Sequence, residues 1–436
     1  MTSALVSDSA RPAGLASSPR PRLGFSGTVV VFIFVVVPLS GISATIVAGT
    51  SGQLRIASFS LTAIVAAVTG IMSWTLVAME RRVPAAAGRV IAVFMAFILA
   101  CIGSALLGTV TRQGTQYISV LIAAVGAMAL SAMVRARLGK ALDYLIARCV
   151  RFTSIVLIAA LVASAGGAHL GVAPQVSSIV ALIGLGWFLA EYRTHHKHAV
   201  WWALALLIAI GLSLSRTALA AGSIAFVGTM IAVPPRYRIR SFIVGLLLLS
   251  AGIWAVTSWA PLHNKFFTGD LSLSAGGLTV NAEGRTQVWH VLWSEVPNAW
   301  LLGHGPGAAS ARSVVIEPAF DQPHNDYLRL IYDFGVVGTA LFGWFTLRIA
   351  RLLKRAKRIG TSSIAPLAAR TAGLAILIVM ITDNPLDYPF VMIPLGALVG
   401  FGLGAATSRG IDSQSEPSIH AGVGVSGRRH RASQRS

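Results

Sequence analysis

Ionisable and polar side chains stand together at one place in an otherwise apolar segment, QPHNDYLRLIYDFGVVG at 322–338. Charge inside an apolar helix is costly, so such residues indicate a functional site. Asn325 is a good N-cap, which places His324 one position before the helix, at its positive end. That end attracts anions such as phosphate and favours a neutral imidazole, the form a general base needs. The segment therefore predicts acid–base chemistry beside an anion.

Two further charges follow along the same predicted helix. Asp333 lies seven residues beyond Asp326, two turns deeper in the apolar stretch. An intramembrane carboxylate is a functional candidate by default. The plainer alternative makes Asp333 a buried partner of Arg329, one turn earlier.

Two arginines and a glycine-rich loop complete the candidate site. Arg216 lies in a tight turn, LSLSRTALAAG at 212–222, and is either functional or a snorkelling cation at a helix end. Arg285 lies in AEGRTQVW at 282–289, where a loop arginine alone is usually part of a weak surface ion pair. Gly303 and Gly305 lie in GHGPG, which lacks the spacing of a phosphate loop and is better explained as a turn.

The stretch TDNPLDYP at 382–389 carries Asp383 and Asp387 about one helical turn apart. Pro385 between them makes a continuous helix unfavourable. We consider two roles for this stretch: a rim whose Asp387 contacts acceptor sugar hydroxyls, or a capped turn between two helices.

The elements that must position these residues are membrane helices. Of the 436 residues, 55% are hydrophobic and 11% are charged. Long unbroken apolar runs predict an all-α polytopic membrane protein of about twelve transmembrane helices, and not a β-barrel. The runs lie near 26–45, 58–78, 90–108, 117–134, 152–172, 176–192, 199–215, 217–233, 241–259, 327–347, 367–383 and 388–404.

The distribution of the basic residues along the chain indicates the membrane topology. With the N-terminus in the cytoplasm and twelve alternating spans, 28 of the 35 Lys and Arg fall on the cytoplasmic face. This is the positive-inside pattern, so both termini are expected in the cytoplasm and the net charge of +20 does not indicate a nucleic-acid partner. Cys101 and Cys149 suggest neither a disulfide nor a metal site, and are expected to be packing residues.

The chain divides into five predicted parts. These are a cytoplasmic tail, nine spans, a large outer-face catalytic loop, three spans and a basic cytoplasmic tail: 1–25, 26–259, 260–326, 327–404 and 405–436. A loop this long in a tight helical bundle is typically functional.

These motifs, in this order, resemble the O-antigen ligase and O-antigen polymerase superfamily. HNDYLRLIYDFGVVG is similar to its His-Asn-x-x-Leu…Gly-x-x-Gly signature, and SLSRTALA to its Ser-Arg turn. EGRTQVW is similar to its Gly-Arg…Trp element, and LLGHGPG to its Gly-x-Gly element. The resemblance is specific over about 210–340. Asp333 departs from it, because members commonly carry Glu there.

The resemblance implies an integral membrane glycosyltransferase of the bacterial inner membrane. Its donor is a glycan on undecaprenyl pyrophosphate, and its acceptor is a glycan, lipid or protein hydroxyl on the outer face. Arg216 and Arg285 are then expected to bind the pyrophosphate and His324 to act on the acceptor. Asn325, Asp333, Arg329, Gly303, Gly305 and Asp387 are expected to support them. No cofactor is expected, and the absence of an Asp-x-Asp or Glu-x-Asp pair predicts metal-independent transfer.

Two questions stay open from the sequence. The motifs do not separate a ligase from a polymerase of O-antigen or exopolysaccharide, although the lack of an acceptor module favours a polymerase. A polysaccharide transporter or flippase is the alternative of a different class. It would place polar groups at the bilayer midplane, and the first six spans carry almost no charge away from their ends.

Overall fold

A computed structural model of the chain describes most of its helical part. The described residues are 24–40, 55–56, 59–80, 83–139, 141–166, 174–194, 196–232, 284–318, 320–358 and 364–405, with scattered residues and short segments between 239 and 280. All structural statements below concern these residues.

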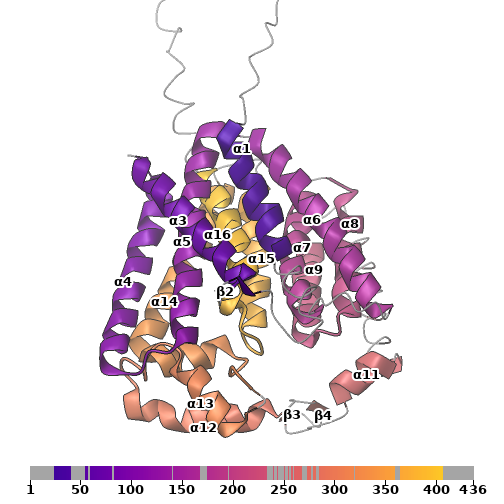
Figure 1. The fold of residues 1–436 in the computed structure, drawn as a ribbon. Helices are drawn as coiled ribbons and strands as arrows, with labels where there is room; N and C mark the ends of the chain where they lie inside the picture. Colours follow the sequence, from indigo (N-terminus) through magenta and orange to yellow (C-terminus); the bar gives the residue numbers. More distant parts are fainter. Residues whose placement is uncertain are drawn as a thin grey trace, which may run out of the picture.

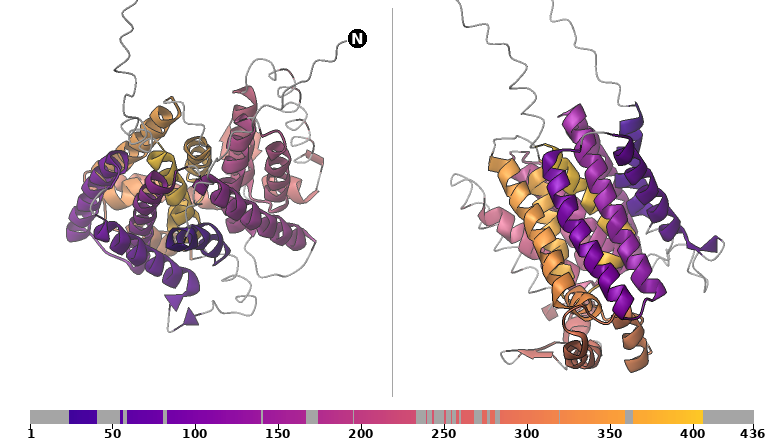
Figure 2. Two further views of the ribbon diagram at one scale, coloured as in Figure 1. Left: turned by 90° about the horizontal axis from the view of Figure 1, so that it is seen from above. Right: turned by 90° about the vertical axis from the view of Figure 1, so that its left-hand side faces the viewer.

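The long helices form a bundle whose axes run nearly parallel, as the side view of Figure 2 shows. In chain order they are α1 (Gly24–Val31) with the π-helical η1 (Phe32–Val36), α3 (Leu61–Met79), α4 (Ala85–Leu107), α5 (Arg112–Leu138), α6 (Ala141–Ala165), α7 (Pro174–Arg193), α8 (Ala199–Leu212), α9 (Arg216–Ile231), α14 (Asp326–Arg358), α15 (Ala365–Val379) and α16 (Pro389–Gly404).

The predicted multi-pass membrane fold agrees with these helices. Five of them, α4, α5, α6, α7 and α14, are long and apolar enough to cross a bilayer, and six shorter apolar helices accompany them. Eleven of the twelve predicted apolar runs coincide with a helix of the bundle. The run at 241–259 lies mostly outside the described residues, so the exact number of twelve spans stays a prediction.

The remaining elements are short, and most of them lie between 260 and 316. They are β1 (Arg55–Ile56), β2 (Phe59–Ser60), α11 (Ala260–Phe267), β3 (Leu273–Ala275), β4 (Leu278–Val280), α12 (Arg285–Glu295), the 3-10 helix η3 (Val296–Ala299), α13 (Ala308–Ile316) and the 3-10 helix η4 (Pro385–Asp387). The strands pair as two small antiparallel hairpins, which are the only departure from an all-helical fold in the described residues. In Figure 1, α12 and α13 lie across one end of the bundle, so the predicted outer-face loop covers that end.

Close contact between α5 and α16 forms the centre of the bundle. A Cβ atom at Gly396, Gly400 or Gly404 would lie 2.1–2.4 Å from a backbone oxygen of α5, so these positions tolerate only glycine. Small residues at a spacing of four let two helix backbones approach in this way. The contact fixes α16, and therefore the turn that precedes it, against α5.

Candidate functional site

His324 lies where the sequence predicts, one position before α14. The side chain of Asn325 caps the helix, because its Oδ1 accepts a hydrogen bond from the amide of Leu328 at 3.0 Å. The predicted N-cap is therefore confirmed. His324 is half-buried and has a left-handed backbone, with φ of 49°. Such a conformation is uncommon for a residue other than glycine and turns its side chain away from the helix axis.

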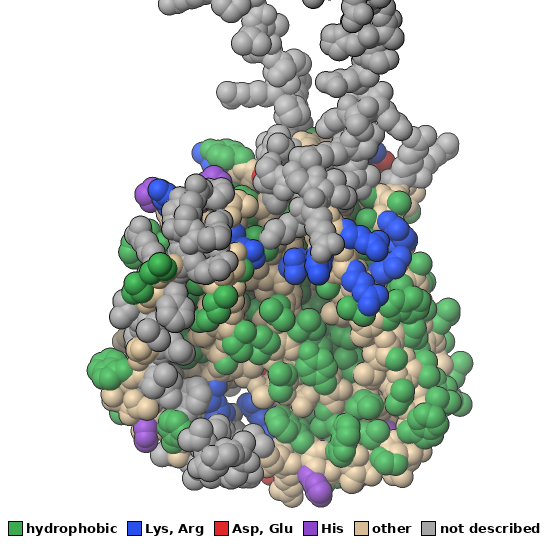
Figure 3. Space-filling view, turned by 180° about the vertical axis from the view of Figure 1, so that it is seen from behind, with side chains coloured by type: hydrophobic (Ala, Val, Ile, Leu, Met, Phe, Trp, Pro, Cys, Tyr) green, Lys and Arg blue, Asp and Glu red, His purple; other side chains and the backbone are tan. Residues whose placement is uncertain are grey.

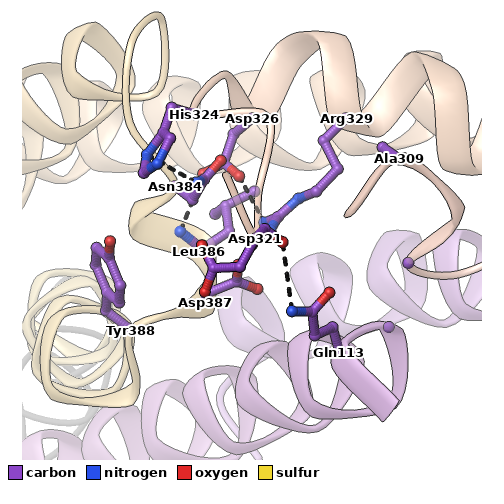
Figure 4. Close-up of polar contacts among 12 residues, drawn as sticks. Gln113, Ala309, Asp321, His324, Asp326, Arg329, Asn384, Leu386, Asp387 and Tyr388 are labelled. Carbon is purple, nitrogen blue, oxygen red and sulfur yellow. Dashed lines mark hydrogen bonds and ion pairs between the residues drawn. The ribbon is translucent and has the colours of Figure 1, made fainter. Parts of the chain in front are cut away.

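The turn between α15 and α16, residues 380–388, meets His324 and holds the start of α14. Nδ1 of His324 lies 3.4 Å from the side-chain amide Nδ2 of Asn384. The amide of Asp326 donates to the carbonyl of Met380 at 2.9 Å, and the amide of Leu386 donates to Oδ2 of Asp326 at 3.0 Å. Figure 4 shows these side chains gathered at the start of α14. We call residues 380–388 the α15–α16 turn.

Both candidate arginines begin a helix that touches the same turn. Arg285 is the first residue of α12, and its Nη1 donates to the carbonyl of Thr382 at 3.0 Å. Arg216 is the first residue of α9, and the hydroxyl of its neighbour Thr217 bonds to that of Thr382. The structure therefore brings the elements of Arg216, Arg285 and His324 together around one turn, although they are far apart in sequence.

The convergence of these elements has an electrostatic consequence. The N-termini of α9, α12 and α14 all contact the α15–α16 turn. Each helix N-terminus carries a partial positive charge and unpaired amide groups, and two of these three begin with an arginine. In Figure 3, Lys and Arg side chains flank an opening near this end, on a face that is otherwise largely hydrophobic. The arrangement is suited to an anion.

Arg329 is buried in an ion-pair network with two carboxylates. It pairs with Asp326 at 2.5 Å and with Asp387, and its guanidinium lies over the ring of Tyr117, 4.4 Å from the centroid. Its side chain is 3% exposed and that of Asp387 is 10% exposed. The network therefore ties α14 to the α15–α16 turn and to α5.

This geometry corrects two expectations. Arg329 does not pair with Asp333, because Asp326 and Asp387 occupy it. Asp387 does not form an open rim for sugar hydroxyls, because it is buried against Arg329. Burial raises the pKa of Asp387, and the positive charge of Arg329 opposes that rise. Asp387 supports the site by holding α14. The turn itself is fixed by Asp383, whose Oδ1 accepts the amide of Asn384 at 2.7 Å.

Asp333 holds the glycine-rich loop. Its carboxylate accepts the amide of Gly307 at 2.9 Å and that of Ala309 at 2.8 Å, and so caps the N-terminus of α13. Both carboxylate oxygens are used, and Asp333 is fully buried. Its shorter reach compared with Glu suits these direct contacts with backbone amides.

Gly303 and Gly305 allow the loop to enter a break in α14. Helix α14 is interrupted at Gly335, with φ of 62° and ψ of −167°. The amides of His304 and Gly305 donate to the carbonyls of Tyr332 and Asp333 at 2.9 and 3.0 Å. A Cβ atom at Gly303 would lie 2.3 Å from the carbonyl oxygen of Asp333, and both glycines have positive φ. The loop is therefore a structural turn, as the sequence favoured, and its glycines approach protein backbone.

A second polar cluster joins α12, α13 and α14 on the outer side of the loop. Glu295 accepts hydrogen bonds from Arg312, at 2.5–3.1 Å, and from the hydroxyl of Tyr332 at 2.8 Å. The hydrogen bonds from Arg312 lower the pKa of Glu295, and partial burial opposes that effect. His304 stacks on Tyr332, with centroids 4.3 Å apart, and so supports the loop.

Thr382 and Asn384 are the site residues that sequence reasoning missed. Thr382 receives Arg285 and Thr217, and Asn384 meets His324. The sequence signal for both residues is the polar run Thr-Asp-Asn at 382–384, between two apolar segments. The two aspartates of the same turn are charged, and their charge indicated a function more strongly than the neutral side chains did. In the described residues, no three His, Cys, Asp or Glu side chains form a group that could hold a metal ion.

Comparison with known proteins agrees with the resemblance seen in the sequence. Residues 199–343 match the family model described as O-antigen ligase. The match runs from the start of α8 into the second half of α14, and so contains Arg216, Arg285 and His324. No curated protein matches the chain. The family supports a membrane glycan ligase or polymerase and gives no support to a transporter.

Proposed function

We propose that this chain, whose residues 199–343 match the O-antigen ligase family model, transfers a glycan from undecaprenyl pyrophosphate to an acceptor hydroxyl. The reaction takes place on the outer face of the bacterial inner membrane, at the end of the bundle covered by α12 and α13. The observation that carries this proposal is the meeting of the start of α9, which begins with Arg216, with Arg285 and His324 around the α15–α16 turn.

Arg216 and Arg285 bind the pyrophosphate of the donor. Guanidinium groups offer several N–H donors in a plane and suit the oxygens of a pyrophosphate. Arg285 begins α12 and donates from Nη1 to the carbonyl of Thr382, which fixes its guanidinium beside the α15–α16 turn. The three helix N-termini add to the positive potential. Because they are fixed in the fold, these groups stabilise the charge that develops on the leaving group without reorganisation.

His324 deprotonates the acceptor, and Asn384 sets its tautomer. An asparagine amide can present either its nitrogen or its oxygen to Nδ1. As placed, Oδ1 of Asn384 is buried without a hydrogen-bond partner among the described atoms. With the amide turned over, Nδ1–H of His324 donates to this oxygen and Nε2 is left unprotonated. In that tautomer Nε2 can accept a proton.

The transfer proceeds as a single displacement. The acceptor hydroxyl loses its proton to Nε2 of His324 while its oxygen bonds to the anomeric carbon. The bond between that carbon and the phosphate oxygen breaks, and the electron pair leaves with undecaprenyl pyrophosphate. Attack opposite the leaving group inverts the anomeric configuration. Because pyrophosphate leaves readily and the arginines neutralise it, we expect turnover to continue in the presence of a metal chelator.

The acceptor favoured here is a second lipid-linked repeat unit, which makes the protein a polymerase. A ligase would use the same donor groups with a lipid or protein acceptor. Incubation with a single lipid-linked repeat unit separates them: a polymerase extends it into a ladder, whereas a ligase requires a second acceptor.

The test of the proposal is transfer by purified protein in detergent, followed by release of undecaprenyl pyrophosphate. His324→Ala should leave donor affinity nearly unchanged and reduce turnover by about 10²–10⁴, the usual contribution of a general base. His290→Ala, an exposed histidine on α12, is the matched control and should be fully active. If donor affinity collapses in His324→Ala while turnover at saturating donor is normal, His324 binds the donor and is not the base.

A further inference from the structure

A cavity of about 460 Å³ lies between α5, α7, α9, α14, α15 and α16 and reaches Met380 and Leu386 of the α15–α16 turn. Arg216, Arg285 and His324 do not line it. Its wall is formed almost wholly by apolar side chains such as Phe342, Ile349 and Leu374. Apolar cavities a third of this size already bind small hydrocarbons, so an open space of this size in a membrane protein is suited to a lipid chain.

The only charged residues that line the cavity in the described part of the chain are Arg193 and Arg370. Arg193 belongs to the last turn of α7, and Arg370 lies near the start of α15. These helix ends lie away from the candidate site, and the two guanidinium groups interact electrostatically. Arg193 donates one hydrogen bond, from Nη2 to the carbonyl of Ala232 at 3.2 Å, which leaves most of its donors for other groups.

Two like charges that face one cavity favour an anion between them. Arginine also suits a phosphate, because its planar fork matches two phosphate oxygens. Figure 3 shows a row of Lys and Arg side chains above the hydrophobic face, at the end away from the opening described earlier. Basic pockets between membrane helices on the cytoplasmic side are typical sites for anionic lipid headgroups.

The length of the cavity indicates which kind of lipid it can hold. From Arg370 to Met380, both of which line it, the ten residues of α15 rise about 15 Å. This is about half of a hydrocarbon core of roughly 30 Å, or one leaflet. A lipid whose phosphate lies at the arginines therefore extends its acyl chain as far as Met380. The donor of the proposed reaction would have its pyrophosphate at the opposite end of the cavity, near Met380. Its hydrocarbon tail would then lie against Arg193 and Arg370, which is unfavourable.

We propose that this cavity binds one anionic phospholipid of the leaflet opposite the candidate site, with its phosphate between Arg193 and Arg370. The acyl chain lies along α15 and ends at Met380 and Leu386. These two residues hold the start of α14 through backbone hydrogen bonds to Asp326. The bound lipid therefore stabilises the α15–α16 turn where Met380 and Leu386 line the cavity. This proposal does not depend on the donor chemistry proposed above.

The first experiment titrates the purified protein with phosphatidylglycerol or phosphatidylcholine and follows its thermal unfolding. A lipid that binds only the folded state raises the unfolding temperature in proportion to the logarithm of its concentration above saturation. We expect phosphatidylglycerol to raise it and phosphatidylcholine to have little effect. In Arg193→Gln/Arg370→Gln, the half-saturating concentration should rise on the order of tenfold or more, because charge-assisted hydrogen bonds to the phosphate are lost.

Arg351→Gln is the control for charge, since Arg351 is an exposed arginine on α14 that does not line the cavity. It should keep the full response to phosphatidylglycerol. An equal loss in Arg351→Gln and in the double variant would mean a diffuse surface effect and would overturn the proposal. So would a full response in the double variant.

A second pair of variants tests the cavity without changing charge. Gly228 and Gly373 line it, and a Cβ atom at either meets no other atom within 4 Å. Gly373→Leu and Gly228→Leu should therefore fold, fill the space and abolish the shift caused by phosphatidylglycerol. Gly343→Leu, equally open but outside the cavity, should keep it.

Retention of the shift in both filled variants would contradict the proposal, even if the arginine variant failed to fold. Undecaprenyl pyrophosphate serves as the competing ligand. If it alone shifts the unfolding temperature, and does so equally in the double arginine variant, the cavity belongs to the donor tail. Loss of transfer in Arg216→Ala with a normal phosphatidylglycerol response would leave this inference intact and test only the proposed function.

Discussion

At the scale of single residues, the chemistry of His324 depends on a neutral neighbour. The imidazole is half-buried at the start of α14. Its Nδ1 faces the buried side chain of Asn384, which is fully inaccessible to solvent. A neutral amide can orient the ring for proton transfer without adding a charge beside it.

Asn384 variants test this orientation. Asn384→Ala should reduce kcat roughly fivefold to tenfold, since one hydrogen bond contributes about 1 kcal/mol. Asn384→Asp should move the acidic limb of the pH–rate profile to higher pH, because a carboxylate beside the ring favours its protonated form. The measurement is kcat against pH for the two variants. An acidic limb that does not move in Asn384→Asp would reduce Asn384 to a packing residue.

Arg285 has two tasks, and a lysine can perform only one of them. Its Nη1 donates to the carbonyl of Thr382, and we propose that the guanidinium also binds the donor pyrophosphate. Arg285→Lys should therefore raise the KM for the donor at least about tenfold, since charge-assisted hydrogen bonds are worth about 1.5–3 kcal/mol each. Arg112→Lys is the matched control, because Arg112 is an exposed arginine that also begins a helix. Wild-type KM in Arg285→Lys would show that the residue is a simple cation.

The residue scale also shows what sequence can predict. Asn325 was assigned correctly because helix capping is a local rule that acts over three residues. The alternative that paired Arg329 with Asp333 was wrong: Arg329 pairs with Asp326, three positions away on the same helix, and with Asp387, which is 58 positions away and which no periodicity indicates. The role of Asn384 was not predicted for the same reason, because its partner His324 is 60 positions away.

At the scale of elements, the broken helix α14 organises the site. The break at Gly335 exposes backbone groups in the middle of an apolar bundle, where unpaired amides and carbonyls are costly. The segment 300–305 satisfies them: its amides donate to Tyr332 and Asp333, and its carbonyls accept from Val336 and Val337. Both glycine motifs, GHGPG at 303–307 and GVVG at 335–338, are visible in the sequence. Nothing in their residues indicates that the first fits into a helix break at the second.

Asp333 connects this loop to α13, and its replacement should loosen the connection. In Asp333→Asn one carboxylate oxygen becomes an NH₂ group that meets the amide of Gly307 or Ala309. Leaving a buried donor unsatisfied costs about 1–3 kcal/mol, so the unfolding temperature should fall and transfer should decrease with it. Asp321→Asn, an exposed aspartate, should leave both unchanged. Normal stability in Asp333→Asn would show that the cap is dispensable.

Glu295 makes the association of α12, α13 and α14 dependent on pH. Its pKa in the folded state is lowered by Arg312, so it contributes stability above the pKa of the unfolded chain. That contribution is lost as the pH falls through the folded pKa, below about 4.3. We expect Glu295→Gln to be less stable than wild type at pH 7, and the difference to shrink progressively as the pH falls further below about 4.3. A difference that persists undiminished at low pH would exclude ionisation of Glu295 as the cause.

At the scale of the whole molecule, hydropathy predicted the bundle and left the assembly of the site open. Apolar runs such as 117–134 and 388–404 coincide with α5 and α16, because a helix is the simplest way to satisfy backbone groups in a bilayer. The packing of these two helices through Gly396, Gly400 and Gly404 was not predicted, since small residues occur throughout the chain. It is this packing that places the α15–α16 turn beside His324.

The proposed orientation can be tested on intact cells. In a chain whose buried Cys101 and Cys149 are replaced by alanine, Ser294→Cys on α12 should react with an impermeant thiol reagent on intact spheroplasts. Lys197→Cys, between α7 and α8, should react only after the membrane is opened. Both positions are exposed, so access depends on the side of the membrane. The opposite pattern would place the site in the cytoplasm.

The break in α14 also dictates when the protein can become active during its synthesis. The loop that enters the break is translated before α14, and its carbonyls at His304 and Pro306 accept hydrogen bonds from the amides of Thr109 and Thr111, between α4 and α5. A nascent chain that ends at residue 325 therefore already contains Arg216, Arg285 and His324, but it lacks α14. The turn that brings their elements together is made later still, at 380–388. Premature termination yields a chain with every proposed reactive group and no assembled site, and its 300–305 segment lacks the helix break into which it fits.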